Sequence, residues 1–354
     1  MTRYHSPGRA RLGHFRVVPA DLTAPQLSET DVGQGGSFGT IWSNRGMRRL
    51  LLPVIAAALV LAGCTGGDDT PDGGEEPTAT ASPTFSADFA DLEEEYDARL
   101  GVYAIDTGTG QVVEHRADER FAYASTIKAL AVGALLHEKP RSVLDQTVEL
   151  GEEDLVENSP ELEKAVEEGE TDLTVRELAD AAVRYSDNTA GNLLFDLLGG
   201  PEELQGVLRE IGDETTIVSR IEPELNEAVP GDDRDTTTPE ALATTLRAFT
   251  LLPADGDAVN NGYARAMLTD LMVRNTTGDD LIRSGVPDNW EVADKTGAAA
   301  YGTRNDIAVL RRADGDPIVL VIMSSKTEQD AEYDNDLIAD ATRVAVAGFD
   351  PEAD

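Results

Sequence analysis

The chain has 354 residues, of which 40% are hydrophobic, so it is not wholly disordered and can bury a sizeable core in one large domain or two. Its 67 acidic residues outnumber its 29 basic residues, which gives a formal charge of −38 at pH 7. A negative field of this size repels nucleic acid and anionic lipid surfaces, which excludes both as expected direct partners.

The first recognisable element is a secretory signal segment. Residues 47–49 read Met-Arg-Arg, and an apolar run follows over residues 50–61. Positive charges, an apolar run and small residues before a cysteine are typical of such segments, and the run is too short to span a bilayer. We therefore predict that residues 47–63 are a signal peptide. Residues 1–46 are then a mis-assigned or unstructured extension, with a genuine cytoplasmic extension as the alternative.

The signal segment ends in Leu-Ala-Gly-Cys at residues 61–64, which resembles the lipobox of bacterial lipoproteins. Cys64 is the only cysteine, so it cannot form an internal disulfide or a thiolate metal site; lipidation explains it better than a buried free thiol does. Residues 64–88 are rich in Gly, Pro, Thr and acidic residues and read as a flexible tether. The expected product is a monomer on the outer face of the bacterial membrane, held there only by its lipid.

The folded domain is expected over residues 89–354, with the globular part beginning near residues 85–91. A helix over 91–100 leads into a hairpin whose strands span 101–105 and 111–115 around a turn with the sequence DTGTG. Apolar periodicity then predicts helices, later strands, and a final helix. The helices span 124–138, 174–186, 188–199, 201–212 and 238–252; the strands span 290–298, 304–312 and 317–325; the last helix spans 334–349. This order implies an α+β (α/β) fold: a five-stranded antiparallel sheet flanked by helices, an all-α lobe, and a site between them.

The stretch FAYASTIKAL places Ser125 three residues before Lys128 at the start of a helix, so the two side chains share one face. A serine nucleophile needs a base. After the signal segment the only histidines are His115 and His137, which we interpret as surface residues, and ligands for a metal site are equally scarce. A lysine can serve as the base if burial or neighbouring cations lower its pKa.

Two further motifs follow in order, Ser-Asp-Asn at 186–188 and Lys-Thr-Gly at 295–297. Together with Ser-x-x-Lys they are the signature of penicillin-recognising serine enzymes. The segment 219–239, SRIEPELNEAVPGDDRDTTTP, is similar to the omega loop of class A β-lactamases. The resemblance to class A serine β-lactamases extends over almost all of residues 91–349, and it implies the same two-lobed fold.

The resemblance implies a role for each matching residue. Ser125 matches the acylated nucleophile and Lys128 the lysine beside it. Ser186 matches the hydroxyl that relays a proton to the leaving nitrogen, and Glu222 the base that activates water for deacylation. Whether Lys128 or Glu222 takes the first proton is disputed for the family.

The residues expected to contact the substrate or its water are Asn188, Asn226, Lys295, Thr296, Gly297, Ala298 and Arg304. Asn188 matches a side chain that binds the substrate amide, and Asn226 one that helps hold the water. Lys295, Thr296 and Arg304 match positions that receive the substrate carboxylate, and the N–H groups of Ala298 and Ser125 would form the oxyanion hole. Arg220 and Asp235 match a loop-closing ion pair, and Glu222-Pro223 matches a cis peptide.

The function implied is hydrolysis of the β-lactam amide through a serine acyl-enzyme, with a small-molecule β-lactam as substrate and no cofactor or metal. Asn158 stands where the family usually has an aromatic residue, and Ala299 replaces a frequent glycine; both are expected to affect substrate range. One alternative is a penicillin-binding D-alanyl-D-alanine peptidase, which lacks the deacylating glutamate loop. The other is a non-catalytic lipoprotein that binds cell-wall peptides or β-lactams.

Overall fold

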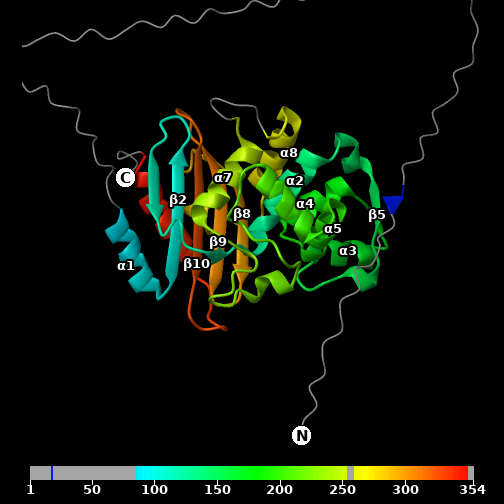
Figure 1. Ribbon diagram of the computed structural model, residues 1–354, viewed down its shortest axis with the longest axis horizontal. Coiled ribbons are helices and arrows are strands. Elements are labelled where there is room, and N and C mark those ends of the chain that lie inside the picture. Colours follow the sequence, from blue (N-terminus) through cyan, green and yellow to red (C-terminus); the bar gives the residue numbers. More distant parts are fainter. Residues whose placement is uncertain (1–16, 19–84, 253–258, 350–354) are drawn as a thin grey trace, which may run out of the picture. The chain divides into compact units, whose positions relative to one another are not determined.

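A five-stranded antiparallel sheet forms one side of the protein. The computed structural model describes residues 17–18, 85–252 and 259–349 (Figure 1). The strand order is β3-β2-β10-β9-β8, with every neighbouring pair antiparallel, as predicted. The strands are β2 (Arg99–Asp106), β3 (Val112–His115), β8 (Glu291–Ala299), β9 (Thr303–Arg311) and β10 (Ile318–Ser325).

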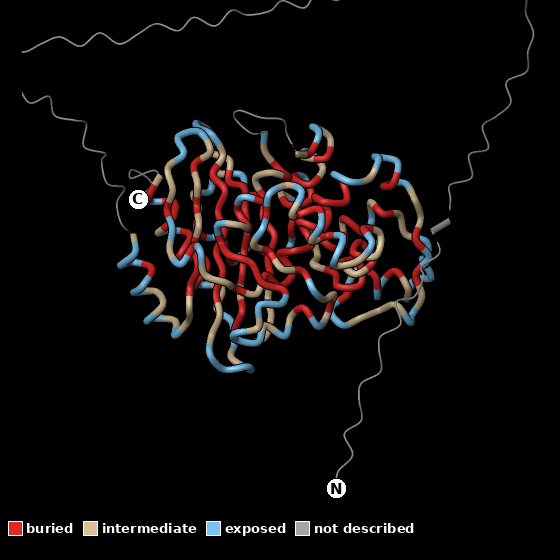
Figure 2. The backbone as a smooth tube through the Cα atoms, in the orientation of Figure 1, coloured by how far each residue is buried: buried red, intermediate tan, exposed pale blue. Residues whose placement is uncertain are grey.

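The central strand β10 is apolar on both faces because each face meets its own core. Ile318, Leu320 and Ile322 belong to a core with α1 (Ser86–Tyr96) and α10 (Asn335–Ala347). The alternate residues Val319, Val321 and Met323 belong to the larger core that continues into the helical lobe. Side chains alternate across a strand, so an unbroken apolar run indicates a strand covered on both faces. Figure 2 shows the resulting band of buried backbone through the sheet.

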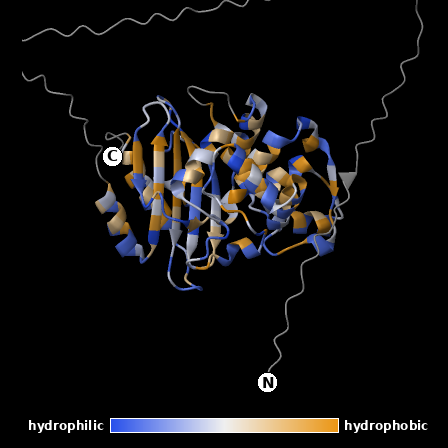
Figure 3. Ribbon diagram, viewed as in Figure 1, coloured by the Kyte–Doolittle hydropathy of each residue, from blue (hydrophilic) through white to orange (hydrophobic). Residues whose placement is uncertain are grey.

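A mainly helical lobe packs beside the sheet around α2 (Figures 1 and 3). Every residue of α2 from Ile127 to Leu136 is buried, so this helix is surrounded rather than amphipathic. The remaining helices are α3 (Pro160–Glu168), α4 (Val175–Arg184), α5 (Asn188–Leu198), α6 (Pro201–Glu210), α7 (Pro239–Thr250), α8 (Gly262–Val273) and α9 (Ile282–Gly285). Thr238 caps α7 by accepting from the N–H of Ala241, and Pro239 follows it as the first residue of the helix.

Several boundaries differ from the sequence prediction. The helix expected over 91–100 is α1, which ends at Tyr96 because Asp97 adopts a left-handed conformation (φ 45°), and Arg99 already belongs to β2. Helices α3 and α8 were not predicted individually. Short strands β4 (Phe121–Ala122) and β7 (Thr236–Thr237) pair with each other, and β1 (Val17–Val18), β5 (Thr147–Glu149) and β6 (Asp172–Thr174) form a second small sheet.

The predicted signal segment and Cys64 lie outside the described residues. After residues 17–18, the described structure continues at residue 85, directly before α1. Among the helices that the structure describes, none has the length and apolar character needed to cross a membrane.

Candidate active site

Ser125 lies in a short 3-10 helix, η1 (Ala124–Thr126), that leads directly into α2. Ala124, just before it, has a positive φ of 49°, a conformation that a non-glycine residue holds only when its surroundings enforce it. The side chain of Lys128 reaches back one turn, and its Nζ lies 2.9 Å from Ser125 Oγ. Ser125 is only 7% exposed and Lys128 only 1%, so the pair sits in a largely water-excluded position.

Lys128 is held by oxygen atoms from two other segments, residues 186–188 and the loop that carries Glu222. Its Nζ donates to Asn188 Oδ1 at 2.6 Å and to the carbonyl of Ser186 at 2.8 Å, and lies 2.9 Å from Glu222 Oε1. Burial lowers the pKa of Lys128, while the Glu222 carboxylate acts in the opposite direction. This environment brings the ammonium closer to the range in which a lysine exchanges a proton with a hydroxyl.

Glu222 joins the same cluster from the segment that follows α6. Ser125 Oγ lies 3.2 Å from its Oε1, and Asn226 Nδ2 donates to its Oε2 at 2.5 Å. The backbone of Glu222 is fixed by Asn192, which accepts from its N–H at 2.8 Å and donates to its carbonyl at 2.9 Å. Asn192 was missed in the sequence, although it stands one helical turn after Asn188 on α5 and so faces the same way.

The loop that carries Glu222 is closed by the ion pair predicted from the sequence. Arg220 Nε lies 2.5 Å from Asp235 Oδ2, and Asp235 also accepts from the backbone N–H of Ser219 at 2.9 Å. The hydroxyl of Tyr123 donates to Asp235 at 2.9 Å, which ties the loop to the chain just before the nucleophile. The peptide bond that precedes Pro223 is cis, as expected.

Lys295 joins the cluster from β8. Its Nζ donates to Ser186 Oγ at 3.0 Å and to the carbonyl of Thr296 at 2.8 Å. Burial and the nearby Lys128 ammonium lower the pKa of Lys295 to about 7. Thr296 is positioned by Thr277, since their hydroxyl oxygens lie 2.6 Å apart; this partner was not predicted from the sequence.

Gly297 allows β8 to lie against the nucleophile. A Cβ at this position would fall 3.0 Å from the carbonyl oxygen of Tyr123 and 3.2 Å from the Cβ of Ala124, so a larger residue would push the strand away. Ala298, the predicted oxyanion residue, is the next residue along and pairs in register with Arg304 on β9.

Arg304 is the predicted carboxylate anchor, and two residues that the sequence did not reveal orient it. Its Nε donates to Asn335 Oδ1 at 2.8 Å, and its guanidinium lies 4.7 Å from the ring centroid of Tyr333. Burial lowers the pKa of Arg304. Of the two departures from the family pattern, Asn158 is exposed with φ 61° and its carbonyl accepts from the N–H of Asn188 at 3.1 Å, while Ala299 ends β8.

The predicted residues fall into one constellation. Direct contacts join Ser125, Lys128, Ser186, Asn188, Glu222, Asn226, Lys295 and Thr296. The neighbouring β8–β9 pair brings Gly297, Ala298 and Arg304 beside them.

Neither histidine belongs to this constellation. The sequence interpretation of His115 as a surface residue was wrong: its side chain is 9% exposed and packs on Phe89 of α1, with ring centroids 5.5 Å apart. His137 is exposed, and its Nδ1 lies 3.0 Å from the carbonyl of Val259. In the described part of the chain, no cluster of three or more His, Cys, Asp or Glu side chains could hold a metal ion.

Gly191 makes room for Lys128, and this gives a test of the packing. A Cβ at Gly191 would lie 2.9 Å from Lys128 Cε, inside normal contact distance. We expect Gly191→Ala to lower the free energy of unfolding by about 1–3 kcal/mol through overpacking. A small gain in helix propensity offsets part of this loss. The matched control is Gly206→Ala in α6, where a Cβ meets nothing within 4 Å and should stabilise the protein by up to about 1 kcal/mol. Thermal unfolding of both variants checks this; equal stabilisation would contradict the contact.

Comparison with known proteins gives one consistent family. Residues 84–349 match the model of the beta-lactamase enzyme family. A β-lactamase of Bacillus licheniformis is 49% identical over 304 residues, covering 85% of this chain and 94% of the relative. One from Amycolatopsis lactamdurans is 53% identical over 274 residues, covering 77% and 88%.

Solved structures agree. The crystal structure of a halotolerant bacterial β-lactamase is 54% identical, with a TM-score of 0.69 over 73% of this chain and 97% of that one. A class A β-lactamase from Clostridium kluyveri is 43% identical, with a TM-score of 0.71 over 75% and 98%.

Proposed function

Because the chain belongs to the beta-lactamase enzyme family, we propose that the buried cluster around Ser125 hydrolyses the amide bond of β-lactam antibiotics in two covalent steps. The chain is a class A serine β-lactamase. The observation that carries the proposal is one contact set: Ser125 Oγ lies 2.9 Å from Lys128 Nζ and 3.2 Å from Glu222 Oε1.

In the first step Ser125 Oγ attacks the lactam carbonyl carbon. Its proton passes to Lys128 or, through water, to Glu222, and the N–H groups of Ser125 and Ala298 stabilise the oxyanion. When the carbon–nitrogen bond breaks, Ser186 delivers a proton to the leaving nitrogen. Its hydroxyl contacts Lys295, so the relay has a proton donor behind it.

In the second step water releases the acyl group. Glu222 takes a proton from this water as it attacks the ester carbonyl carbon. When the ester bond breaks, Lys128 gives a proton to the Ser125 oxygen and recovers one from Glu222, since its Nζ lies 2.9 Å from both groups. Asn226 and the backbone contacts of Asn192 hold the carboxylate in place for this role. Turnover of a chromogenic cephalosporin tests the function: we expect many turnovers per enzyme, whereas a penicillin-binding peptidase would stop near one.

The lowered pKa of Lys295 predicts that KM depends on pH. Since the pKa of Lys295 in the free enzyme is lowered to about 7, the lysine loses its charge as the pH rises through that value. Substrate carboxylate binding favours the protonated form, so KM should rise between about pH 6 and about pH 9 while kcat changes less. Steady-state kinetics across this range checks the prediction, and the slope should vanish in Lys295→Met. A KM independent of pH in the wild-type enzyme would contradict it.

We also propose that the enzyme works outside the cytoplasm as a monomer attached to the membrane by lipid at Cys64. The lipobox-like segment and the lone cysteine support this, together with the acidic tether that follows. Several acyl chains are needed for stable attachment, because one alone binds weakly.

The attachment has a simple test. In a bacterial host, Cys64→Ser should move most of the activity from the membrane fraction to the soluble fraction, because no acyl chain can be added. Intact mass of detergent-extracted wild-type protein should show a lipidated residue 64 as its first residue. Membrane retention of Cys64→Ser would contradict the proposal.

A further inference from the structure

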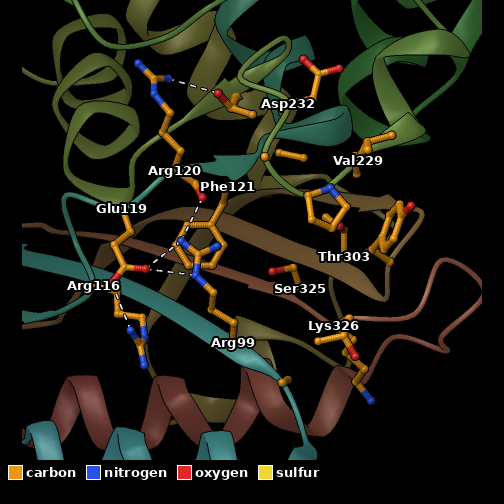
Figure 4. A pocket seen from close by; sticks show the side chains of 18 of the residues that line it. Arg99, Arg116, Glu119, Arg120, Phe121, Val229, Asp232, Thr303, Ser325 and Lys326 are labelled. Atoms are coloured by element: carbon orange, nitrogen blue, oxygen red, sulfur yellow. Dashed lines mark hydrogen bonds and ion pairs between the residues drawn. The ribbon is translucent and has the colours of Figure 1, made fainter.

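One wall of a hollow of about 810 Å³ beside segment 228–233 consists of paired charges (Figure 4). Glu119 lies between Arg99 and Arg116, and its carboxylate accepts from Arg99 at 2.9 Å and from Arg116 at 3.0 Å. Both guanidinium groups are therefore neutralised within the protein. A different kind of polar cluster lies beside Thr296, the residue expected to receive the substrate carboxylate, because its hydrogen bonds form a chain with a fixed direction.

The chain begins at a buried ion pair on the same face of β8 as Thr296. Asp294 precedes Thr296 by two residues, so their side chains leave the strand on one side. The side chain of Asp294 is 0% exposed, and it accepts from Arg283 Nε at 2.7 Å and from Asn275 Nδ2 at 2.5 Å. Guanidinium and amide nitrogens can only donate, so Asp294 is the acceptor at this end of the chain.

A second buried carboxyl group, Asp306 of β9, bears on the charge of Asp294. Oδ2 of Asp306 accepts from the N–H of Ile282 at 3.2 Å, and its Oδ1 has no hydrogen-bond partner within the described part of the chain. Burial raises the pKa of both carboxyl groups, but at Asp294 the Arg283 guanidinium opposes the rise. Asp306 therefore takes the proton of the pair, and Asp294 keeps the negative charge.

Asn275 carries the direction of the ion pair to Thr277. Its Nδ2 faces Asp294, and its Oδ1 accepts from the backbone N–H of Thr277 at 3.1 Å and from the Thr277 hydroxyl at 2.9 Å. A backbone N–H can only donate and an ionised carboxylate can only accept, so both ends fix which way the amide points. The single proton of the Thr277 hydroxyl is therefore used on Asn275.

The contact between Thr277 and Thr296 then has one donor. Their hydroxyl oxygens lie 2.6 Å apart, and either could donate if the pair were isolated. Because the proton of Thr277 points at Asn275, Thr296 donates to Thr277 and turns its lone pairs elsewhere. A substrate carboxylate accepts hydrogen bonds and donates none, so the Thr296 hydroxyl of the free enzyme is turned the wrong way to receive it.

We propose that Thr277 is a positioning residue that holds the Thr296 proton away from the substrate carboxylate until substrate binds. On binding, the Thr296 hydroxyl rotates to donate to the carboxylate, and the Thr277 hydroxyl rotates to donate to Thr296. Asn275 Oδ1 then keeps only the N–H of Thr277. Each bound substrate thus costs one internal hydrogen bond, so Thr277 weakens binding. The proposal rests on the proposed function, which supplies the carboxylate.

Thr277→Val should tighten substrate binding, whereas loss of a merely supporting contact would weaken it. Valine has no oxygen to accept from Thr296, so that hydroxyl is free to donate to the carboxylate. Calorimetric titration of a penicillin into Ser125→Ala, which cannot be acylated, measures the effect. Adding Thr277→Val to this parent should lower Kd roughly two- to tenfold, as expected for one hydrogen bond.

Three variants in the same background serve as controls. Thr277→Ser keeps the hydroxyl and should bind as the parent does. Thr276→Val removes a hydroxyl that donates to the carbonyl of Arg184, outside the chain, and should also leave Kd unchanged. In Thr296→Val the hydroxyl that rotates is absent, so adding Thr277→Val should then give no gain.

Neutron diffraction from deuterated wild-type protein without substrate observes the direction of the chain itself. The deuterium of the Thr277 hydroxyl should lie toward Asn275 Oδ1, and that of Thr296 toward Thr277. A deuterium of Thr277 directed at Thr296 overturns the proposal, whether or not the enzyme hydrolyses β-lactams.

The titrations decide the consequence for binding. Tighter binding in Thr277→Val that disappears in the Thr296→Val background supports the proposal. Weaker or unchanged binding in Thr277→Val overturns it, and so does a gain that persists in the Thr296→Val background. A parent variant that binds no penicillin contradicts the proposed function instead, and the neutron result still decides the direction of the chain.

Discussion

Glu222→Gln should convert the enzyme into one that is acylated and then stalls. Glutamine keeps nearly the shape of the glutamate and can still accept from Asn226, but it cannot take a proton from water. Loss of a general base typically costs about 10²–10⁴-fold, so deacylation should slow by that factor. Intact mass after mixing with a penicillin should show an adduct equal to the mass of the whole substrate.

The matched control for this variant is Glu224→Gln in the same loop. Glu224 is exposed, whereas Glu222 is 2% exposed and within reach of the nucleophile. Glu224→Gln should therefore turn over normally and leave no adduct. If Glu222→Gln cleared its adduct as quickly as the wild type, the carboxylate would not be the deacylating base.

Ser125→Ala should abolish adduct formation altogether. Alanine removes the attacking oxygen but leaves Lys295, Thr296 and Arg304 in place, so substrate should still bind. We expect kcat to fall on the order of 10⁴-fold or more while affinity, measured by competition with a chromogenic substrate of the wild-type enzyme, changes little. Ser142→Ala, at an exposed serine of the same lobe, should behave as the wild type.

The double variant distinguishes the roles of the two residues. Ser125→Ala blocks formation of the acyl-enzyme and Glu222→Gln blocks its hydrolysis, so the double variant should resemble Ser125→Ala and show no adduct. An adduct on the double variant would mean that another side chain is the nucleophile.

Much of the site could be predicted because its residues lie in short, specific motifs. Ser125 and Lys128 are one turn apart, so local helix geometry alone brings them together. The five strands and their antiparallel arrangement were predicted from the hairpin and strand patterns, whereas the strand order and the burial of β10 on both faces were found only in the structure. The predicted features depend on neighbours in the sequence, which is why a single chain reveals them.

The residues that were missed act across long sequence separations. Thr277 contacts Thr296, and Asn335 contacts Arg304, through a single hydrogen bond each. Single asparagines and threonines carry no spacing signal, because their usual role in loops is local capping. The exposure of His115 was misjudged for the same reason. The ring that covers it, Phe89 of α1, lies far from it in the sequence and reaches it only when the chain folds.

A time course of intact mass, combined with a chromogenic cephalosporin assay on the wild-type protein, tests hydrolysis through an acyl-enzyme at Ser125. We expect a transient acyl adduct on the peptide that contains Ser125, return of the mass to that of the free enzyme, and many turnovers in that time. A stoichiometric adduct that persists, or turnover with no adduct on Ser125 detectable even in Glu222→Gln, would contradict it.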